Sequence, residues 1–446
     1  MERSSGRKSI AVVGTGIAGM SAAWLLDRGH DVTVYERAGR LGGHSNTVTV
    51  PGATGEIAVD TGFIVYNEFT YPNLTALLDH LGVATQPSEM SLAISLRGGD
   101  VEYSGSLAGL FADKRNLLRP RFWSMLRDLQ RFYREAPRDL EAPQRVHTSL
   151  GEYLAAGGYG NAFRDDHLLP MAASIWSAPA RQILDYPAAA FIRFQHSHGL
   201  LRLRNRPQWR TVCGGSRSYV ERLTKPYRHR IRIGTAVTGI RRGADAVTIR
   251  DGSGGIESYD AVVLACHADQ ALALLDDAHA DERRLLGAFR YGSNLAVLHS
   301  DAALMPRRRA VWSSWNHIGG NSEAPAVSYW MNSLQSIAQE TPLFVTLNPP
   351  FEPRRVWHRE AYQHPMFDAA AIAAQRELWS LQGRRRSYFC GAYFGAGFHE
   401  DGLQSGLAVA EALGGRRRPW SVANESGRIV VADTPPLEGR PMEVAA

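Results

Sequence analysis

The sequence has 446 residues, more than one typical domain holds, so we expect two domains built from interleaved segments. Its 44% hydrophobic and 21% charged residues are typical of a globular protein, and no run reaches the ~18 uncharged apolar residues of a membrane helix. The three cysteines lie far apart without a CxxC pair, which gives no sign of a disulfide framework or a metal site and fits a reducing compartment.

The net charge of +6 is mild, but nearly all of the 50 basic residues are arginines. Codon bias alone would explain this preference for arginine over lysine, which would then carry no functional meaning. Three arginine triplets, at 307–309, 384–386 and 416–418, leave open an anionic surface partner such as phospholipid headgroups. No nucleic-acid-binding module accompanies them, so we expect no nucleic-acid partner.

Residues 10–36 form the pattern of a strand, a glycine turn, a helix and a second strand that ends in an acid. The turn consists of Gly14, Thr15, Gly16, Ile17, Ala18 and Gly19. Gly14 allows the tight turn, Gly16 lets backbone N–H groups approach a pyrophosphate, and Gly19 lets the helix lie close to the strand. Glu36 is placed to accept hydrogen bonds from a ribose hydroxyl. The pattern predicts a dinucleotide site; the alternative is a glycine turn without function.

The segment before this strand, residues 1–8, carries basic side chains but leads directly into the predicted site. Its cleavage as a signal peptide would destroy that site. We therefore expect a cytoplasmic protein, and the arginine triplets leave open peripheral contact at the inner face of the membrane.

After Glu36 comes a run of charged residues and glycines, Arg37-Ala-Gly-Arg40-Leu-Gly42-Gly43-His44-Ser45. The glycines let the chain pass close to a bulky ligand, and Arg40 can reach a pyrophosphate. Together with the glycine turn, this run resembles the FAD-dependent amine oxidase superfamily, which includes monoamine and polyamine oxidases, protoporphyrinogen oxidase and phytoene desaturases. The resemblance implies that Arg37 belongs to the cofactor site and that Gly42, Gly43 and His44 lie near the isoalloxazine ring. A loop histidine touching phosphate or water is the alternative for His44.

The same resemblance implies further cofactor contacts. The run 57–65 is similar to the family's next strand and places Thr61 and Gly62 near the ring. The turn 214–216 opens a helix to about residue 223, as a similar glycine turn does in the family. Val237 matches the position whose backbone holds the adenine.

The run 387–406 resembles the family's C-terminal FAD motif, in which a strand ends in a glycine beside the ribityl phosphate. We expect a helix at 407–413, since the motif leads into a helix whose N-terminal N–H groups stabilise negative charge on the reduced flavin. The cofactor residues carried over here are Gly391, Asp401, Gly402 and Leu403.

Candidates for acid–base or catalytic roles come from motif position alone. His44, His399 and Tyr393 are the catalytic candidates, and Phe398 and Glu400 are expected beside the same ring. In the middle of the chain, His196 and His198 would face opposite ways if their segment were a strand.

Residues 71–204 resemble the cap that is inserted into the flavin domain in this superfamily. Helices are predicted at 74–81, 122–134 and 148–154. The segments 171–179 and 191–201 are candidates for lining a greasy cavity, although each of their residues is as readily explained as plain core.

The rest of the chain is dominated by predicted strands. One set follows the glycine turn, at 231–233, 237–242, 246–250, 256–259 and a buried run at 260–266, with a short helix at 269–275. A second set, at 295–299, 311–315, 326–330 and 343–347, predicts an antiparallel sheet that forms the floor of a substrate domain.

The predicted fold is α/β, with a Rossmann-like FAD-binding domain interleaved with an α+β substrate domain that has an antiparallel sheet and a helical cap. The FAD-binding domain would comprise 1–70, 205–290 and 386–420, and the substrate domain 71–204 and 291–385. Residues 421–446 would form a tail, with about the last ten disordered.

The chemistry follows from a flavin that accepts a hydride at N5 in a dry pocket. Amine oxidases of the superfamily carry a lysine near N5, but no lysine occurs after Lys225. No cysteine is suited to covalent attachment, since Cys390 is more readily explained as core, so we expect non-covalent FAD.

The whole-chain pattern looks closest to a bacterial branch of predicted NAD/FAD-binding proteins, with relatives that act on unsaturated fatty acyl chains. The leading hypothesis is an FAD-dependent oxidoreductase that abstracts a hydride from an apolar, fatty-acyl or lipid-like substrate. Three alternatives stay open: a redox-neutral double-bond isomerase, an amine oxidase and a flavin-binding protein without catalysis. The glycine motifs cannot distinguish the four hypotheses, because all four proteins would bind FAD alike.

Overall fold

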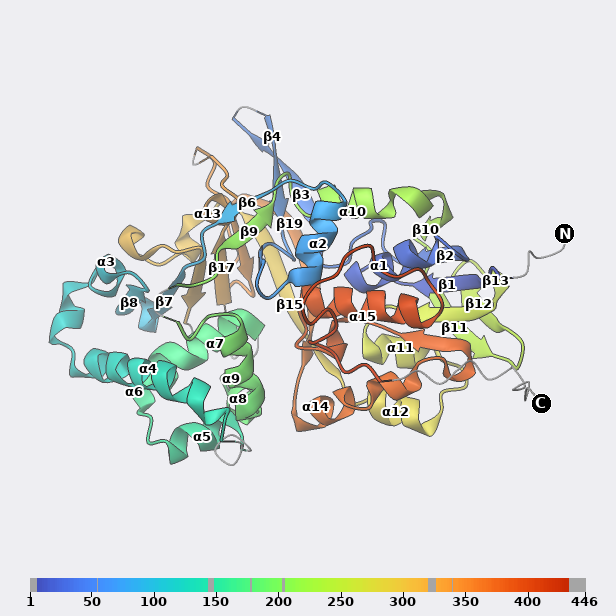
Figure 1. Ribbon diagram of the computed structural model, residues 1–446. Helices are drawn as coiled ribbons and strands as arrows, with labels where there is room; N and C mark the ends of the chain where they lie inside the picture. Colours follow the sequence, from blue (N-terminus) through green and yellow to red (C-terminus); the bar gives the residue numbers. More distant parts are fainter. Residues whose placement is uncertain are drawn as a thin grey trace.

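The computed structural model describes residues 6–432 except 54, 143–147, 177–178, 203–204, 320–325 and 339. The expectation of disorder over the last ten residues lies outside this range. The described chain forms two lobes (Figure 1). The right-hand lobe contains a parallel sheet with α1 and α15, and the left-hand lobe contains a larger sheet with a cluster of helices below it.

The parallel sheet has five strands in the order β10-β2-β1-β14-β20. They are β1 (Ser9–Val13), β2 (Asp31–Glu36), β10 (Ile231–Ile233), β14 (Ala261–Leu264) and β20 (Ser387–Phe389). Distant parts of the chain pair directly, since Ile10 lies opposite Ala261 and Val262 opposite Ser387. The central strands β1 and β14 are buried and largely apolar, as expected for strands covered on both faces, whereas the edge strand β10 is partly exposed. This sheet confirms the predicted Rossmann-like, interleaved α/β fold.

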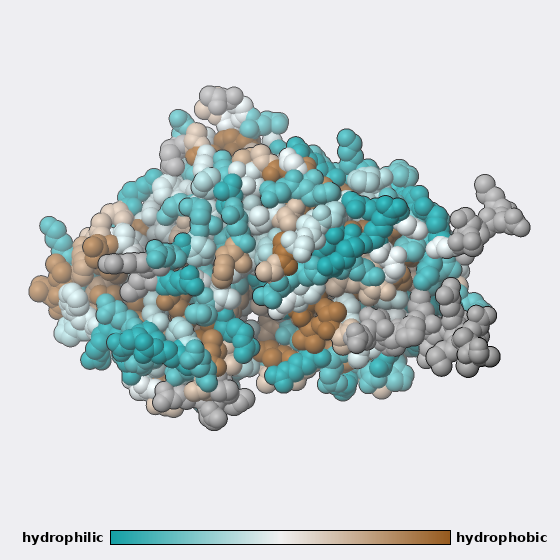
Figure 2. All heavy atoms as spheres, viewed as in Figure 1, coloured by the Kyte–Doolittle hydropathy of each residue, from teal (hydrophilic) through white to brown (hydrophobic). Residues whose placement is uncertain are grey.

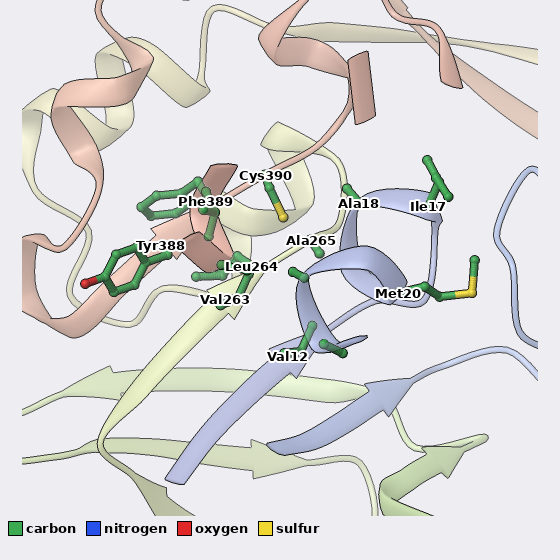
Figure 3. Packing of buried hydrophobic residues seen from close by; sticks show 14 of the residues in the cluster. Val12, Ile17, Ala18, Met20, Val263, Leu264, Ala265, Tyr388, Phe389 and Cys390 are labelled. Atoms are coloured by element: carbon green, nitrogen blue, oxygen red, sulfur yellow. The ribbon is translucent and has the colours of Figure 1, made fainter. Parts of the chain in front are cut away.

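Two helices lie against each other beside this sheet, α1 (Ile17–Leu26) and α15 (His399–Ala412). Their contact depends on glycine, since a Cβ on Gly406 would lie 2.2 Å from the carbonyl oxygen of Ala18 and one on Gly402 would lie 2.9 Å from Ile17 Cγ2. Figure 3 shows Ala18, Ala265 and Cys390 gathered at the carboxyl ends of β1, β14 and β20. The prediction that this helix starts at residue 407 is wrong. It starts at His399, because packing on α1 offsets the low helix propensity of the two glycines.

A three-stranded antiparallel sheet and several helices complete the right-hand lobe, and the predicted strands there are confirmed. These elements are β11 (Val237–Arg242), β12 (Val247–Asp251), β13 (Ile256–Tyr259), α2 (Pro72–His80), α10 (Arg217–Thr224), α11 (Ala268–Leu274), α12 (Ala280–Leu286) and α14 (Ala369–Gln375). The helix α2 comes from the segment predicted as cap, yet it contacts α15.

The large sheet of the left-hand lobe has seven strands in the order β19-β15-β18-β17-β16-β7-β8. They are β7 (Leu92–Leu96), β8 (Val101–Ser104), β15 (Arg290–His299), β16 (Trp315–Ile318), β17 (Ala326–Trp330), β18 (Phe344–Leu347) and β19 (Val356–Met366). The predicted antiparallel sheet is confirmed with one exception, because β16 and β7 pair in parallel.

The predicted strand at 311–315 is wrong. Arg309–Val311 forms a 3₁₀ turn and the strand starts at Trp315, because the Trp312 indole N–H donates to the Pro306 carbonyl and holds that segment as a loop. Two small sheets join the lobes, one of β3 (Thr47–Gly52) and β4 (Gly55–Asp60), the other of β5 (Tyr66–Asn67), β9 (Trp209–Val212) and β6 (Thr85–Ser88).

The cap consists of helices around a separate apolar core that contains Phe132, Phe163 and Phe191. Its helices are α3 (Leu107–Leu110), α4 (Pro120–Asp139), α5 (Leu150–Ala156), α6 (Asn161–Phe163), α7 (Leu169–Trp176), α8 (Ala180–Asp185) and α9 (Ala188–Ser197); the short α13 (Met331–Leu334) lies at the large sheet. The segment that carries His196 and His198 is thus helical. No helix in the described part of the chain is long and apolar enough to span a membrane.

We predict that Gly406→Ala destabilises the protein by about 2 kcal/mol, because the added methyl group would force α15 away from α1. Urea denaturation at a fixed flavin concentration measures this. Gly29→Ala, just beyond α1, is the matched control, since its Cβ would meet no atom within 4 Å. Equal stability of the two variants would contradict the account of this helix contact.

Candidate functional site: a dinucleotide cradle and an aromatic cap

The glycine turn after β1 leaves a helix N-terminus open. Gly14 has φ +104°, and a Cβ there would lie 2.8 Å from the carbonyl oxygen of Ala265, so only glycine fits. Gly16 precedes α1 without a side-chain cap, and the space where its Cβ would project contains no protein atom within 4 Å. The first N–H groups of α1, at Ile17, Ala18 and Gly19, can therefore bind a pyrophosphate at this position.

A second glycine loop crosses this turn. A Cβ on Gly43 would lie 3.1 Å from Gly16 Cα, and the Gly42 N–H donates to the carbonyl oxygen of Thr15 at 3.1 Å. Arg40 donates to the Gly43 carbonyl at 2.7 Å and forms an ion pair with Glu360 at 3.1 Å. The guanidinium of Arg40 thus holds this loop in place, and its contact with a pyrophosphate stays a prediction.

The carboxylate of Glu36 is fixed at the end of β2. One oxygen accepts hydrogen bonds from the Thr15 N–H at 3.0 Å and the Thr15 hydroxyl at 2.5 Å, and the other accepts from the Ala38 N–H at 2.8 Å. The Thr235 N–H donates to the Glu36 carbonyl at 2.8 Å, which brings the strand of Val237 to the same end of the sheet. The predicted adenosine contacts therefore lie together, while Arg37 is exposed beside them.

His44 lies in a buried group of aromatic and imidazole rings. Its ring centroid is 4.9 Å from that of Tyr362, 5.4 Å from that of His364 and 6.5 Å from that of His267. Burial lowers the pKa of His44 well below its usual range, so the ring is neutral, and its Nε2 has no hydrogen-bond partner among the described residues. A buried ring nitrogen without a partner fits a site that faces a bound cofactor.

The loop of Thr61 and Gly62 supports His44 from behind. A Cβ on Gly62 would lie 2.2 Å from the His44 carbonyl oxygen, which accepts a hydrogen bond from the Phe63 N–H at 2.7 Å. The Thr61 and Tyr362 hydroxyls are 2.8 Å apart. One rigid unit is thus formed by Gly62, Thr61 and His44.

The sequence did not point to three residues of this group, Tyr362, His364 and His267. The two-residue spacing of Tyr362 and His364 could have indicated them, because it places both on one face of β19.

His399, at the first position of α15, is held between Phe63 and Tyr219. Its ring stacks on Phe63 at 3.9 Å, and its Nε2 and the Tyr219 hydroxyl form a hydrogen bond of 2.7 Å. The Tyr219 hydroxyl also bonds Ser45 Oγ, next to His44. Burial lowers the pKa of His399 to about 3, so this histidine is neutral near pH 7.

The other candidates at α15 are engaged elsewhere. The carboxylate of Asp401 accepts hydrogen bonds from the Phe398 N–H at 2.7 Å and from Arg428 at 2.6 Å. The expectation that Glu400 lies beside the ring is wrong: its carboxylate accepts from the backbone N–H groups of Asn73 and Leu74 at the start of α2. It caps that helix, whose first N–H groups would otherwise be unpaired.

Arg428 is a residue that the sequence analysis did not single out. Its guanidinium donates to Asp401 and, at 2.9 Å, to the carbonyl oxygen of Thr70. The Arg428 side chain therefore anchors the segment around it to the start of α15.

Tyr393 packs into the core rather than beside the two histidines. Its ring contacts are Phe289 at 5.3 Å and Phe394 at 5.0 Å, and its buried hydroxyl has no hydrogen-bond partner among the described residues. Leu403 is fully buried and Gly391 precedes Tyr393 at the end of β20. A direct catalytic role for Tyr393 has no support from these contacts and stays a prediction.

Aromatic side chains of the cap meet the start of α15. Phe194 of α9 stacks on Phe398 at 4.8 Å, and Trp176 of α7 lies 4.7 Å from Phe194. His198 stacks on Phe194 at 3.9 Å and also lines a cleft of about 550 Å³ that extends past Met90, Leu200 and Trp209. We call Trp176, Phe194 and Phe398 the aromatic wall. Trp176 and Phe194 come from the segments 171–179 and 191–201, of which residues 177 and 178 lie outside the described residues; that these segments line a cavity stays a prediction.

Two of the three cysteines are poorly suited to a covalent bond with a ligand, and Cys213 lies partly exposed before α10. Cys390 is fully buried in the core, and Cys266, after β14, has its pKa raised to about 12 by burial. The described residues also contain no group of three or more His, Cys, Asp or Glu side chains that could hold a metal ion.

Comparisons with known proteins identify the family. The sequence profile of the family described as "Flavin containing amine oxidoreductase" matches residues 17–300, more than half of the chain. The protein belongs to this family. Its cofactor is FAD, and the open N-terminus of α1, the crossing of Gly43 over Gly16 and the unpaired His44 Nε2 all fit that cofactor.

Sequence identity to an individual relative is low and covers part of the chain. The chain is 29% identical over 264 residues to AofH of Mycobacterium tuberculosis, which carries the name of a flavin-containing monoamine oxidase. The match covers 57% of this chain and 56% of that protein, so the chain spans about half the length of the curated relative it matches.

Solved structures share the whole fold. A variant of a putrescine oxidase has a TM-score of 0.68 at 15% identity, with 91% of this chain and 98% of that chain covered. A CLA-producing fatty acid isomerase from P. acnes has a TM-score of 0.62 at 16% identity, with the same coverage. At these identities the likeness establishes the fold alone.

We predict that Gly16→Val abolishes flavin binding without unfolding the protein. The added Cβ meets no protein atom within 4 Å, but the valine side chain would occupy the pyrophosphate position, so FAD affinity should fall at least about 100-fold, equivalent to ~2.7 kcal/mol. The wild type should purify yellow and the variant colourless, and Gly29→Val, whose Cβ is equally unobstructed, serves as the control. A yellow G16V protein with one FAD per chain would contradict the assigned pyrophosphate position.

A second prediction concerns Asp60, the buried last residue of β4. Thr47 and Ser216 donate to its carboxylate at 2.6 and 2.8 Å, but burial dominates and raises its pKa from 3.8 to about 6. Because the folded-state pKa is raised, the stabilisation is complete below about pH 4 and is lost as the pH rises through 6, a change of about 3 kcal/mol.

Replacing Asp60 with Asn keeps the side chain neutral, so D60N should flatten the fall in stability between about pH 4 and pH 7. Urea denaturation across this range measures the effect. An unchanged slope in D60N would show that another group causes the pH dependence.

Proposed function

We propose that the protein is an FAD-dependent oxidoreductase that removes a hydride from an apolar, fatty-acyl or lipid-like substrate. The observation that carries this proposal is the aromatic wall of Trp176, Phe194 and Phe398 at the N-terminus of α15. Such a surface binds a hydrocarbon chain through area removed from water and offers no charge to a cationic substrate.

FAD, when bound, would supply an electrophilic N5 that accepts the hydride, and in a net oxidation the neighbouring carbon would also lose a proton to water, so that a double bond forms. The protein's own residues supply position and environment. The aromatic wall would exclude water from the substrate. The N–H groups at the start of α15 would stabilise negative charge on the reduced cofactor. His44 and His399 are neutral and buried, so they can position a ligand by hydrogen bonds without adding a charge.

Two observations weigh against an amine substrate. The chain has three lysines, and all lie away from this site: Lys8 precedes β1, Lys114 is in a 3₁₀ turn of the cap and Lys225 follows α10. The acidic groups nearest the aromatic wall, Glu400 and Asp401, are saturated by hydrogen bonds from the protein. An ammonium group would therefore be desolvated without compensation. The similarity to AofH is what keeps an amine oxidase as an alternative.

A redox-neutral isomerase is the second candidate, because this reaction needs no proton acceptor, and the lowered pKa values of His44 and His399 make both of them weak bases. In that reaction the hydride returns to another carbon of the same substrate, so the double bond moves and no oxidant is consumed. A flavin-binding protein without catalysis remains the third alternative.

We further propose that the protein is cytoplasmic and contacts the anionic inner face of the membrane, where an apolar substrate would be found.

Anaerobic mixing of the purified holoprotein with unsaturated fatty acids tests these proposals. We expect lasting loss of the oxidised-flavin absorbance for net oxidation, and a double bond moved at constant mass with unbleached flavin for isomerisation. Putrescine and a monoamine serve as controls and should leave the spectrum unchanged. Bleaching by amines but not by fatty acids would contradict the apolar-substrate proposal.

A further inference from the structure

The outer end of the cap carries a group of exposed apolar side chains. Leu118 is 86% exposed, Leu107 80%, Leu117 49% and Trp123 47%. They come from α3, the 3₁₀ turn Lys114–Leu118 and the first residues of α4. Figure 2 shows hydrophobic side chains at the left edge of the molecule, where Figure 1 draws the segment that joins α3 to α4. Single exposed leucines are common, but four large apolar side chains on one short segment mark an interaction site.

The structure holds these side chains in place. The Trp123 indole N–H donates to the Leu117 carbonyl at 3.0 Å, and the Trp123 ring lies 5.8 Å from that of Phe111. Beneath them, the buried Asn116 side chain donates to the carbonyl oxygens of Glu102 and Leu110. The apolar group is therefore a fixed projection and does not fold back onto the protein.

An arginine-lined pocket of about 450 Å³ lies beside this projection. It is lined by Arg97, Arg115, Arg307 and Arg308 together with Asp100 and two glycines. Arg115 belongs to the same 3₁₀ turn as Leu117 and Leu118, so the pocket and the apolar group share one element. Residues 97–121 and 307–309 together contain eight basic and three acidic residues.

The arginines of the pocket are not all neutralised by the protein. Arg97, Arg115 and Arg308 pair with Asp166, Asp113 and Glu102 respectively. The Arg307 guanidinium has no ion pair among the described residues, and its side chain passes close to Gly99. A positive pocket with one unpaired guanidinium suits a phosphate.

In the other two triplets Arg386 and Arg416 likewise have no ion pair among the described residues, and the other arginines are paired. Arg384 and Arg385 pair with Asp281 and Asp277. Arg417 and Arg418 both pair with Glu411, and Arg418 is buried. The triplet 307–309 is thus the one that combines free positive charge with neighbouring exposed apolar side chains.

We propose that this end of the cap, Leu107, Leu117, Leu118 and Trp123 with the arginine pocket, docks onto a bilayer that contains anionic phospholipid. The apolar side chains enter the interface, and the pocket binds a lipid phosphate. A second copy of the chain fits poorly, because a two-fold contact here would bring two equally positive surfaces together. The inference deepens the peripheral contact proposed above, and vesicle binding is measured without turnover, so its failure would leave the flavin chemistry untouched.

Sedimentation of the full-length holoprotein with vesicles tests this surface. We expect binding to phosphatidylcholine vesicles that contain phosphatidylglycerol and much weaker binding to pure phosphatidylcholine. The double variant Leu117→Ser/Leu118→Ser should lose about tenfold or more in partitioning, and Arg307→Gln roughly fivefold. Ile256→Ser, 67% exposed on β13, and Arg250→Gln, 51% exposed and paired with Asp276, are the matched controls and should bind like the wild type.

Several outcomes would overturn the proposal. These are no binding of the wild type to anionic vesicles, equal losses in the controls, or a drop for Arg307→Gln with none for the double leucine variant, which would indicate adsorption by charge alone. A concentration-dependent dimer of the wild type that becomes monomeric in the double variant would assign the surface to self-association instead.

Discussion

The packing of α15 on α1 is the contact on which the rest of the site depends. It brings the helix that follows the last strand of the parallel sheet against the helix that follows the first, over a distance of nearly 400 residues in sequence. Gly402 and Gly406 allow this approach, because any larger side chain would meet Ile17 or the backbone of Ala18. As a result, the first turns of both helices lie against each other, since Gly402 contacts Ile17, and we predict that both contact the cofactor.

Around this contact the protein places neutral rather than charged groups. His44 and His399 are kept neutral by burial, and Tyr219 links them through Ser45. The acids at the start of α15 are used to hold other parts of the chain, Glu400 at α2 and Asp401 at Arg428. In the hydride transfer that we propose from an apolar chain, the substrate would therefore meet neutral side chains at this position.

The sequence predicted the parts of this site that depend on local backbone geometry. Gly14, Gly19, Gly42 and Gly43 stand where a turn or a close approach requires glycine, and Gly16 leaves open the space predicted for the pyrophosphate. Prediction from the sequence failed where long-range packing decides the structure. The start of α15 was placed eight residues late because glycines are poor helix formers in isolation. The strand β19 was missed because its partly buried face carries the polar residues His358, Glu360 and His364, so the sequence lacks hydrophobic alternation. Tyr362 and His364 were lost with that strand, and Arg428 was missed because its partner, Asp401, is distant in sequence.

The central claim is that both glycine motifs serve one non-covalently bound FAD. Acid precipitation of the purified protein, followed by quantification of flavin in the supernatant and the pellet, tests it most directly. The account predicts one FAD per chain, all of it released into the supernatant, since Cys390 lies in the core and Cys266 is held as a thiol. Protein without flavin, or flavin that remains with the precipitated chain, would contradict it.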